Sequence, residues 1–545
     1  MNKKSFSVFV CLIFLVTSLS VEAQSNSNPL NQIEILKEKN EIVSSAVPPG
    51  YFNLADIINE MNELENSYSS ICKVYDLTEF YNLEPTYENR HIYAMKISDN
   101  VLVDEDEPNF LMVSCHHARE IVTPVIALYS MMQLTAYYGV DPEITAVVDG
   151  YEIWISPVWN VDGYEYVFNF NNMWRKNRHP YSPGIGVDLN RNYPFGWYSP
   201  GSGSTDPTSE TYKGPSPASE AETKTMMVLG NDRHFAKVLD YHSYGREVLY
   251  GYLSLSHPFQ SFFQSEAVLL SVASGYGGAI RDPSADGENF QWHLAYNGSY
   301  ANLIETHSDF QPSYSSAMLE AELLWPGALW MLQRPISVSG HVIDSLTQEP
   351  LVAEIKLNGI TFPNGEYFFT EHRFGRYHLF LPAGTYLIEF SCENYVNQTH
   401  EVTVTQTSAL VLDVQLDRFN QKPNKPSIEG TTNGDPGIVY YYVFNATDPD
   451  ADNIEYYIKW GDGDIEEWIG PYPSSEEINL SHSWEKGGKY IISAKVRDIF
   501  GEESTSETLE ITIPRSKVIV INSLLYRFLH NYPKLFAILR NFLKI

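Results

Sequence analysis

Apolar positions recur with two different periods in the first part of the chain. Five residues at helical spacing predict a helix near residue 54, and a longer apolar pattern predicts another over 121–137. Short apolar runs at 91–97, 110–114 and 151–158 predict strands between and after them. This alternation is typical of an α/β domain with a parallel or mixed sheet, in which active sites gather at the carboxyl ends of the strands.

The pattern changes near residue 334 to short alternating strands that are separated by Gly and Pro turns. The expected strands cover 336–343, 353–357, 376–381, 384–390 and 401–405. They predict a small all-β sandwich. A Pro- and Lys-containing connection at 422–427 leads to further short strands that run to about residue 514, so two all-β domains are expected after the α/β domain.

The tail at 515–545 differs from the rest of the chain because it contains no Asp or Glu. Leucine and phenylalanine recur near helical spacing with Lys and Arg between them, which predicts a basic amphipathic helix. Pro533 and the charges argue against a membrane span. A helix that lies at the membrane or cell surface and a helix docked on the preceding domain both remain open.

Composition and the first residues indicate where the protein acts. The 545 residues carry a formal net charge of −32 with a pI near 4.8, which argues against a nucleic-acid partner. Lys3 and Lys4 precede an apolar run over 6–21, and small residues follow, so residues 1–23 are expected to be a secretory signal peptide. Residues 24–48 are expected to be a linker or a short pro-segment. We therefore expect a secreted, extracellular or cell-surface protein.

The candidate chemistry begins directly after the 110–114 strand. His117 and Glu120 stand three residues apart, so their side chains project from one face of a turn or first helical coil. His242 ends another apolar strand, and Glu305 closes a third. Two imidazoles and one carboxylate form a common catalytic zinc site with a position left for water, and a further carboxylate can act as a base. Each residue alone also fits an ordinary role as a surface charge, a core histidine or a salt-bridge partner.

Five motifs strengthen this interpretation because they occur together and in order. They are HARE at 117–120, WRKNR at 174–178, GVDLNRN at 186–192, DYHSYG at 240–245 and LIET at 303–306. With them, residues 49–333 resemble the zinc metallocarboxypeptidases, the carboxypeptidase A-like or funnelin family. The resemblance implies a mixed eight-stranded sheet flanked by helices and one Zn²⁺ per chain. It also implies release of single amino acids from the free C-terminus of a peptide or protein substrate.

The resemblance also implies a role for each matching residue. His117, Glu120 and His242 match the zinc ligands, and Glu305 matches the general base. Three further residues match groups that act on the substrate: Arg175 polarises the scissile carbonyl, and Asn190 and Arg191 hold the terminal carboxylate. His116 is an alternative ligand, but the spacing of the motif favours His117.

Two expectations concern substrate contacts for which the sequence departs from the family. The tyrosine that closes over substrate falls on Pro283 when counted back from Glu305, so Tyr276 would serve only if an insertion follows it. Phe290, two residues before Trp292, stands where the base of the specificity pocket is set. It predicts a preference for apolar or aromatic C-terminal residues. Asp286 or Glu288, if either reached the pocket, would select Lys or Arg instead.

The remaining regions resemble known accessory domains. Residues 334–418 resemble the transthyretin-like domain that follows some of these carboxypeptidases. Residues 424–514, with a WGDG turn at 460–463, resemble a PKD-like immunoglobulin-type sandwich. Two other functions stay open at this point: an amidase of the same fold acting on cell-wall peptides, and a catalytically inactive surface-binding protein.

Overall fold

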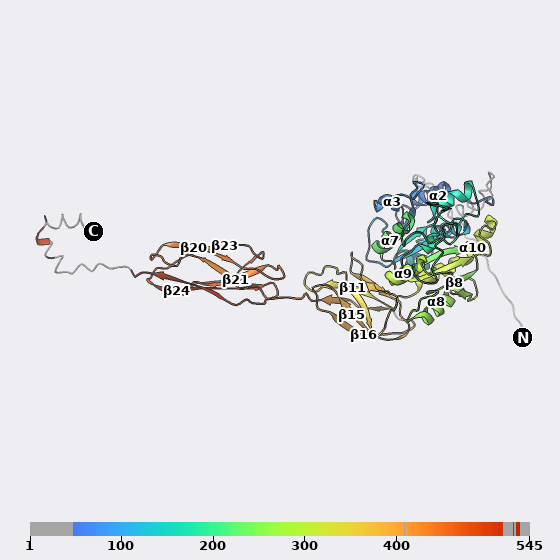
Figure 1. Cartoon of the computed structure of the whole chain (residues 1–545). Coiled ribbons are helices and arrows are strands. Elements are labelled where there is room, and N and C mark those ends of the chain that lie inside the picture. Colours follow the sequence, from blue (N-terminus) through green and yellow to red (C-terminus); the bar gives the residue numbers. More distant parts are fainter. Residues whose placement is uncertain (1–46, 408, 516–526, 528–529, 533, 535–545) are drawn as a thin grey trace, which may run out of the picture. The chain divides into compact units, whose positions relative to one another are not determined.

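The computed structural model describes residues 47–407, 409–515, 527, 530–532 and 534 (Figure 1). The expected signal peptide and most of the segments 24–48 and 515–545 lie outside the described residues. The chain divides into two compact units, one that ends at Asp417 and one that begins at Arg418.

The first unit is built on a mixed eight-stranded sheet, which confirms the expected α/β fold. Its strand order is β1-β2-β4-β3-β7-β10-β8-β9. The strands are β1 (Cys72–Asp76), β2 (Tyr93–Ile97), β3 (Asn109–Ser114), β4 (Glu152–Ser156), β7 (Lys237–Ser243), β8 (Glu247–Leu249), β9 (Ile280–Arg281) and β10 (Tyr300–Thr306). The central strands β4, β3, β7 and β10 run parallel to one another, so their carboxyl ends meet at one edge of the sheet.

The helices of this unit cover the sheet. They are α2 (Leu54–Ser67), α3 (Leu77–Phe80), α4 (Val122–Tyr137), α5 (Pro142–Val148), α6 (Val161–Asn169), α7 (Ala221–Arg233), α8 (Gln260–Ala273), α9 (Asn289–Tyr296) and α10 (Tyr314–Gln333), with a short 3₁₀ helix η1 (Leu189–Arg191). Every residue of β3, β4 and β7 is buried, which explains their continuous apolar runs. Helix α4 packs on β3, β7 and α10 and is buried on nearly all sides.

Local sequence signals explain where several helices begin. Asn53 caps α2 by accepting a hydrogen bond from the amide of Asp56, whose carboxylate accepts one from the amide of Asn53 in return. Asp141 caps α5 in a similar way, and Pro142 occupies the first helical position, where its missing amide hydrogen has no cost.

A β-sandwich follows the sheet within the same compact unit. Its strands are β11 (Val338–Asp344), β12 (Glu354–Asn358), β13 (Phe368–Phe369), β14 (Arg376–Leu379), β15 (Gly384–Ser391), β16 (Gln398–Val404), β17 (Leu410–Val411) and β18 (Val414–Leu416). Burial alternates along β11 and β12, as expected for strands with one face in a core. The expected strands are thus present, within a few residues at their ends.

The sandwich and the α/β region share a buried interface. The ring of Phe380 stacks on that of Tyr300 with centroids 5.1 Å apart. The Nε2 atom of His378 lies 3.0 Å from the carbonyl oxygen of Asn297, a contact in which a neutral imidazole donates. At the rim, Arg373 forms ion pairs with Asp232 and Asp104. The sandwich is therefore packed onto the α/β region as part of one unit.

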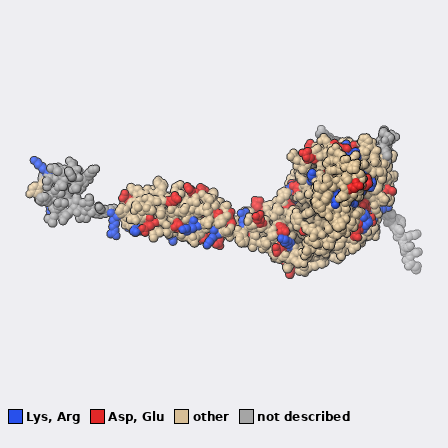
Figure 2. All heavy atoms as spheres, in the orientation of Figure 1, with Lys and Arg blue, Asp and Glu red and all other residues tan. Residues whose placement is uncertain are grey.

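The second unit is an all-β sandwich of a three-stranded and a four-stranded sheet. Its strands are β19 (Ser427–Gly430), β20 (Val439–Asn445), β21 (Ile454–Lys459), β22 (Ile465–Tyr472), β23 (Ile478–Ser483), β24 (Gly488–Asp498) and β25 (Glu507–Ile513). Trp460 of the WGDG turn and Trp484 are both buried in its core. In the face shown in Figure 2, acidic and basic side chains are interspersed. In the described part of the chain, no helix has both the length and the apolar character that a membrane span requires.

The buried interface predicts an acid-sensitive stability. Burial lowers the pKa of His378 to about 3, below the value of about 6.5 in an unfolded chain. The unfolded state therefore binds the proton more readily than the folded state. The contribution of neutral His378 to the free energy of unfolding is full above pH 6.5 and is lost as the pH falls. Between pH 6.5 and pH 5 the loss amounts to about 2 kcal/mol. We expect the melting temperature to fall less between pH 7 and pH 5 for a His378→Gln variant than for the wild type. The exposed His372 provides the control, because His372→Gln should behave like the wild type.

Candidate active site

The candidate metal ligands meet where two parallel strands end. His117 and Glu120 lie in the turn between β3 and α4, and His242 lies near the end of β7. Strands β3 and β7 pair in parallel with Ser114 opposite Tyr241, so the residues that follow β3 lie beside His242. The fold thereby brings together residues that are about 120 positions apart in the sequence.

The three side chains present their donor atoms to a common point. His117 Nδ1 lies 2.7 Å from Glu120 Oε1, and His242 Nδ1 lies 3.1 Å from both Glu120 Oε2 and His117 Nδ1. All three residues are buried, and their ligand atoms lie within 4.8 Å of one another. Two nitrogens and one carboxylate at this spacing fit a zinc ion.

Each imidazole also has a carboxylate at its other nitrogen. His117 Nε2 lies 3.0 Å from Asp188 Oδ1, and His242 Nε2 lies 3.2 Å from Asp240 Oδ1. Such partners fix the orientation of a ligating histidine and leave its first nitrogen free for a metal. Both the three candidate ligands and the carboxylates that orient their imidazoles therefore fit a zinc site.

His116, the alternative ligand from the sequence, lies in a neighbouring group with Asp240 and His242. Its Nδ1 is 3.2 Å from Asp240 Oδ1, and its Nε2 is 3.1 Å from the hydroxyl of Tyr193. The Nδ1 contact lacks hydrogen-bond geometry, so this nitrogen is buried without a hydrogen-bond partner among the described residues. Both groups bring metal-ligating atoms together, and the motif spacing remains the reason to predict His117 as the ligand.

Glu305 lies beside the ligands because β10 pairs in parallel with β7, where Glu305 is directly opposite His242. Its Oε2 atom is buried without a hydrogen-bond partner. Burial and the nearby charge of Glu120 raise the pKa of Glu305 to about 7. Burial alone would also raise the pKa of Glu120, but His117 and His242 outweigh it and hold that pKa well below the usual range. The two carboxylates are thus suited to different tasks, one to proton transfer and one to a permanent charge.

Arg175 is fixed beside the ligands by Asp188. Its Nε and Nη2 atoms donate to Asp188 Oδ2 at 3.1 and 2.8 Å, and its Nη1 lies 3.9 Å from Glu120 Oε1. A guanidinium in this place can stabilise negative charge that develops next to the metal.

Asn190 and Arg191 lie in η1, directly after Asp188. The side chain of Asn190 accepts a hydrogen bond from the amide of Asn289 and places its Nδ2 3.3 Å from His242 Nε2. Arg191 Nη1 donates to Glu288 Oε1 at 2.9 Å. Burial raises the pKa of Glu288 to about 7 although Arg191 opposes the shift, and its Oε2 has no partner. Arg191 is therefore already paired with one carboxylate.

The other expected substrate contacts have different surroundings. The hydroxyl of Tyr276 donates to Glu320 Oε1 at 2.6 Å. Phe290 in α9 is fully buried in the core of the first unit. The carboxylate of Asp286 accepts hydrogen bonds from Ser199, Leu253 and Ser254. The contacts of Tyr276 and Phe290 do not favour the predicted roles, which stay predictions.

Sequence reasoning missed several residues that shape this site. Asp188 lies in the GVDLNRN motif and Asp240 in the DYHSYG motif, two residues before Asn190 and His242. Their place in these motifs is the sequence signal that could have identified them. No motif contains Arg281, whose Nη2 lies 3.5 Å from Glu305 Oε1, so nothing in the sequence indicates its contact with Glu305.

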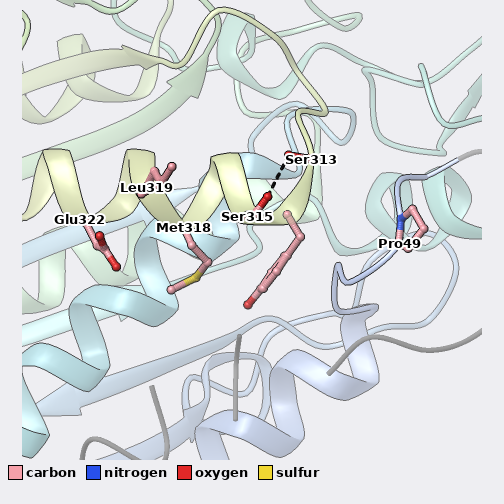
Figure 3. A pocket seen from close by; sticks show the side chains of 7 residues that line it. Pro49, Ser313, Ser315, Met318, Leu319 and Glu322 are labelled. Carbon is pink, nitrogen blue, oxygen red and sulfur yellow. Dashed lines mark hydrogen bonds between the residues drawn. The ribbon is translucent and has the colours of Figure 1, made fainter. Parts of the chain in front are cut away.

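The structure also has a hollow of about 500 Å³ beside the first turns of α10, shown in Figure 3. Pro49, Tyr314, Met318 and Leu319 are among the residues that line it. None of the candidate site residues lies in its wall. The metal-ligand cluster is therefore recognised by its chemistry rather than by this cavity.

The α/β region of the chain is similar to known proteins. The sequence profile of the zinc carboxypeptidases matches residues 57–322. Metallocarboxypeptidase A of Trichophyton rubrum is 32% identical over 239 residues, which cover 41% of this chain and 55% of that enzyme. The chain thus spans about half the length of the curated relatives that it matches.

Two solved structures are similar to separate parts of the chain. The crystal structure of thrombin activatable fibrinolysis inhibitor is 24% identical, covering 52% of this chain and 73% of that one with a TM-score of 0.47. The PKD domain of an M14-like peptidase from a Thermoplasmatales archaeon is 54% identical, covering 18% of this chain and 99% of that one with a TM-score of 0.18. With the match over residues 57–322, the α/β region of this chain is a zinc carboxypeptidase domain.

Proposed function

We propose that the protein is a zinc metallocarboxypeptidase that removes single amino acids from the free C-terminus of peptides or proteins. The observation that carries the proposal is the position of Glu305, directly opposite His242 on the neighbouring strand. A base with a pKa near 7 thus lies beside a two-histidine, one-carboxylate cluster.

The chemistry divides among the residues of the site. A zinc ion held by His117, Glu120 and His242 would supply a Lewis acid that activates water and polarises the scissile carbonyl. Glu305 accepts the proton of the attacking water and passes it to the leaving amine. Arg175, oriented by Asp188, stabilises the negative charge on the carbonyl oxygen.

Selection of the chain end rests on Arg191, with Asn190 beside it. A guanidinium binds a carboxylate with two parallel hydrogen bonds, so it discriminates a free C-terminus from an amide. An apolar or aromatic C-terminal residue is proposed because Asp286 is held by its own partners and the charge of Glu288 is paired with Arg191.

We also propose that the protein is secreted and associates with a cell surface. These proposals rest on the sequences of residues 1–23 and 515–545, which predict a signal peptide and a basic amphipathic helix. Comparing the full chain with one that ends at residue 514 in cell and medium fractions would test the role of the tail.

Metal content tests which histidine is the ligand. We expect about one zinc per chain in the purified protein. Glu120→Gln should weaken zinc binding at least about tenfold, because it removes a charged ligand. His116→Gln is the matched control, since it changes a neighbouring buried histidine and should leave zinc content unchanged. Loss of zinc from His116→Gln but not from Glu120→Gln would mean that the neighbouring group holds the metal.

Product release tests the base and the carboxylate requirement. The wild type should release the last residue of a peptide with a free C-terminus and leave the matching peptide amide intact. Glu305→Gln should lower kcat by at least about 100-fold, because an amide cannot accept the proton. Its zinc content should stay near that of the wild type. Equal release from the amide would contradict the carboxypeptidase assignment and favour an amidase.

Substrate preference can be measured with two peptides that differ only in their last residue. We expect faster release of Phe than of Arg, because the acids near the site already have partners. Faster release of Arg would show that Glu288 exchanges Arg191 for a basic substrate side chain. A Glu288→Gln variant would then lose that preference while still releasing Phe.

A further inference from the structure

Arg281, to which the family resemblance assigns no role, contacts the proposed general base Glu305. Arg281, at the end of β9, places its Nη2 3.5 Å from Glu305 Oε1 and its Nε 2.6 Å from Glu247 Oε1. Its Nη1 donates to the hydroxyl of Ser284 at 2.9 Å and to the carbonyl oxygen of Asp282 at 3.2 Å. All three nitrogens of the guanidinium thus have partners, which fixes its position.

The strand register explains why a cation is needed there. Strands β10 and β8 pair antiparallel with Glu305 directly opposite Glu247. Like charges in such a pair repel each other. Gly245 keeps this space open, because a Cβ at that position would lie 2.8 Å from Glu247 Oε1 and 3.1 Å from Glu305 Cβ. Arg281 lies across this pair and compensates both charges.

The contact with Arg281 also distinguishes the two oxygens of Glu305. Oε1 is held by the guanidinium, whereas Oε2 is buried and has no partner. A carboxylate anchored by one oxygen has a restricted orientation, and its second oxygen remains available for a proton. A base must be held within hydrogen-bond reach of the proton that it transfers, so its orientation affects the rate.

We propose that Arg281 is a positioning residue for the carboxypeptidase reaction, which holds Glu305 by Oε1 and prevents Glu247 from displacing it. This inference rests on the proposed function of the site. It assigns no contact between Arg281 and the substrate, so its effect belongs in kcat rather than in KM.

A double-mutant cycle with Glu247 tests the proposal. Arg281→Met should lower kcat by about 10- to 100-fold with KM changed less than about threefold, because Glu305 is no longer held and faces an uncompensated Glu247. Adding Glu247→Gln to Arg281→Met should raise kcat at least about threefold, because it removes the repulsion between Glu247 and Glu305. Arg281→Lys should fall between the wild type and Arg281→Met.

A second readout separates positioning from general stability. Arg334, which forms a two-point ion pair with Glu266 far from β9 in sequence, provides a matched control. Arg334→Met should lower the melting temperature without changing kcat. Melting temperatures of the metal-free proteins should show the same rescue of Arg281→Met by Glu247→Gln, because the repulsion exists without metal or substrate.

Each outcome decides between the alternatives. A rise in KM with unchanged kcat would mean that Arg281 contacts substrate and would overturn the positioning role. A loss of kcat that Glu247→Gln does not restore would also overturn it, in favour of a structural role for the 281–284 turn. If Arg281→Met matched the wild type, only the positioning proposal would fail. A wild-type protein that released no amino acid from any peptide would refute the proposed function, and the positioning role with it.

Discussion

One buried carboxylate connects the parts of the site. Asp188 accepts hydrogen bonds from the ring of His117, from both the Nε and Nη2 atoms of Arg175, and from the amide of Asn190. Burial alone would raise the pKa of Asp188, but Arg175 and His117 outweigh it and hold that pKa well below the usual range. A charge this deeply buried is tolerated because each of its oxygens has partners. The candidate metal ligand His117, the candidate oxyanion donor Arg175 and the start of η1 therefore depend on one side chain.

The sheet provides the second constraint, because it determines which residues can meet. The parallel register of β3, β7 and β10 places His117, His242 and Glu305 at one edge, although they come from three distant segments. The first sandwich packs against the same unit, where Phe380 stacks on Tyr300, the first residue of β10. The strand that carries Glu305 thus begins at the sandwich interface and ends in the site. Packing at the interface supports β10, and β10 positions Glu305.

Sequence reasoning predicted the fold class correctly, because the alternation of helical and extended apolar patterns marks the α/β domain. It also placed His117, His242 and Glu305 next to apolar runs, and these residues lie at one edge of the sheet. For Arg175, which lies in a loop, sequence reasoning relied on the family resemblance. It was less informative where the role depends on neighbours from other strands. Nothing in the sequence shows that Glu247 faces Glu305 or that Arg281 lies between them, because the pairing of β8, β9 and β10 arises only in the folded sheet. Similarly, Tyr276 is a plausible tyrosine in the sequence, but its bond to Glu320 is a tertiary contact.

The Arg191–Glu288 pair would limit how the proposed site takes a C-terminal carboxylate. A substrate that binds Arg191 brings a second anion close to Glu288, and two ionised carboxylates on one guanidinium leave an uncompensated negative charge in a buried place. Because the pKa of Glu288 is about 7, proton uptake near neutral pH relieves this conflict at a modest free-energy cost. A neutral Glu288 can keep its place and donate a hydrogen bond, while the substrate carboxylate takes over the charge of Arg191. The same burial that raises the pKa of Glu288 thus makes exchange of one carboxylate for another feasible.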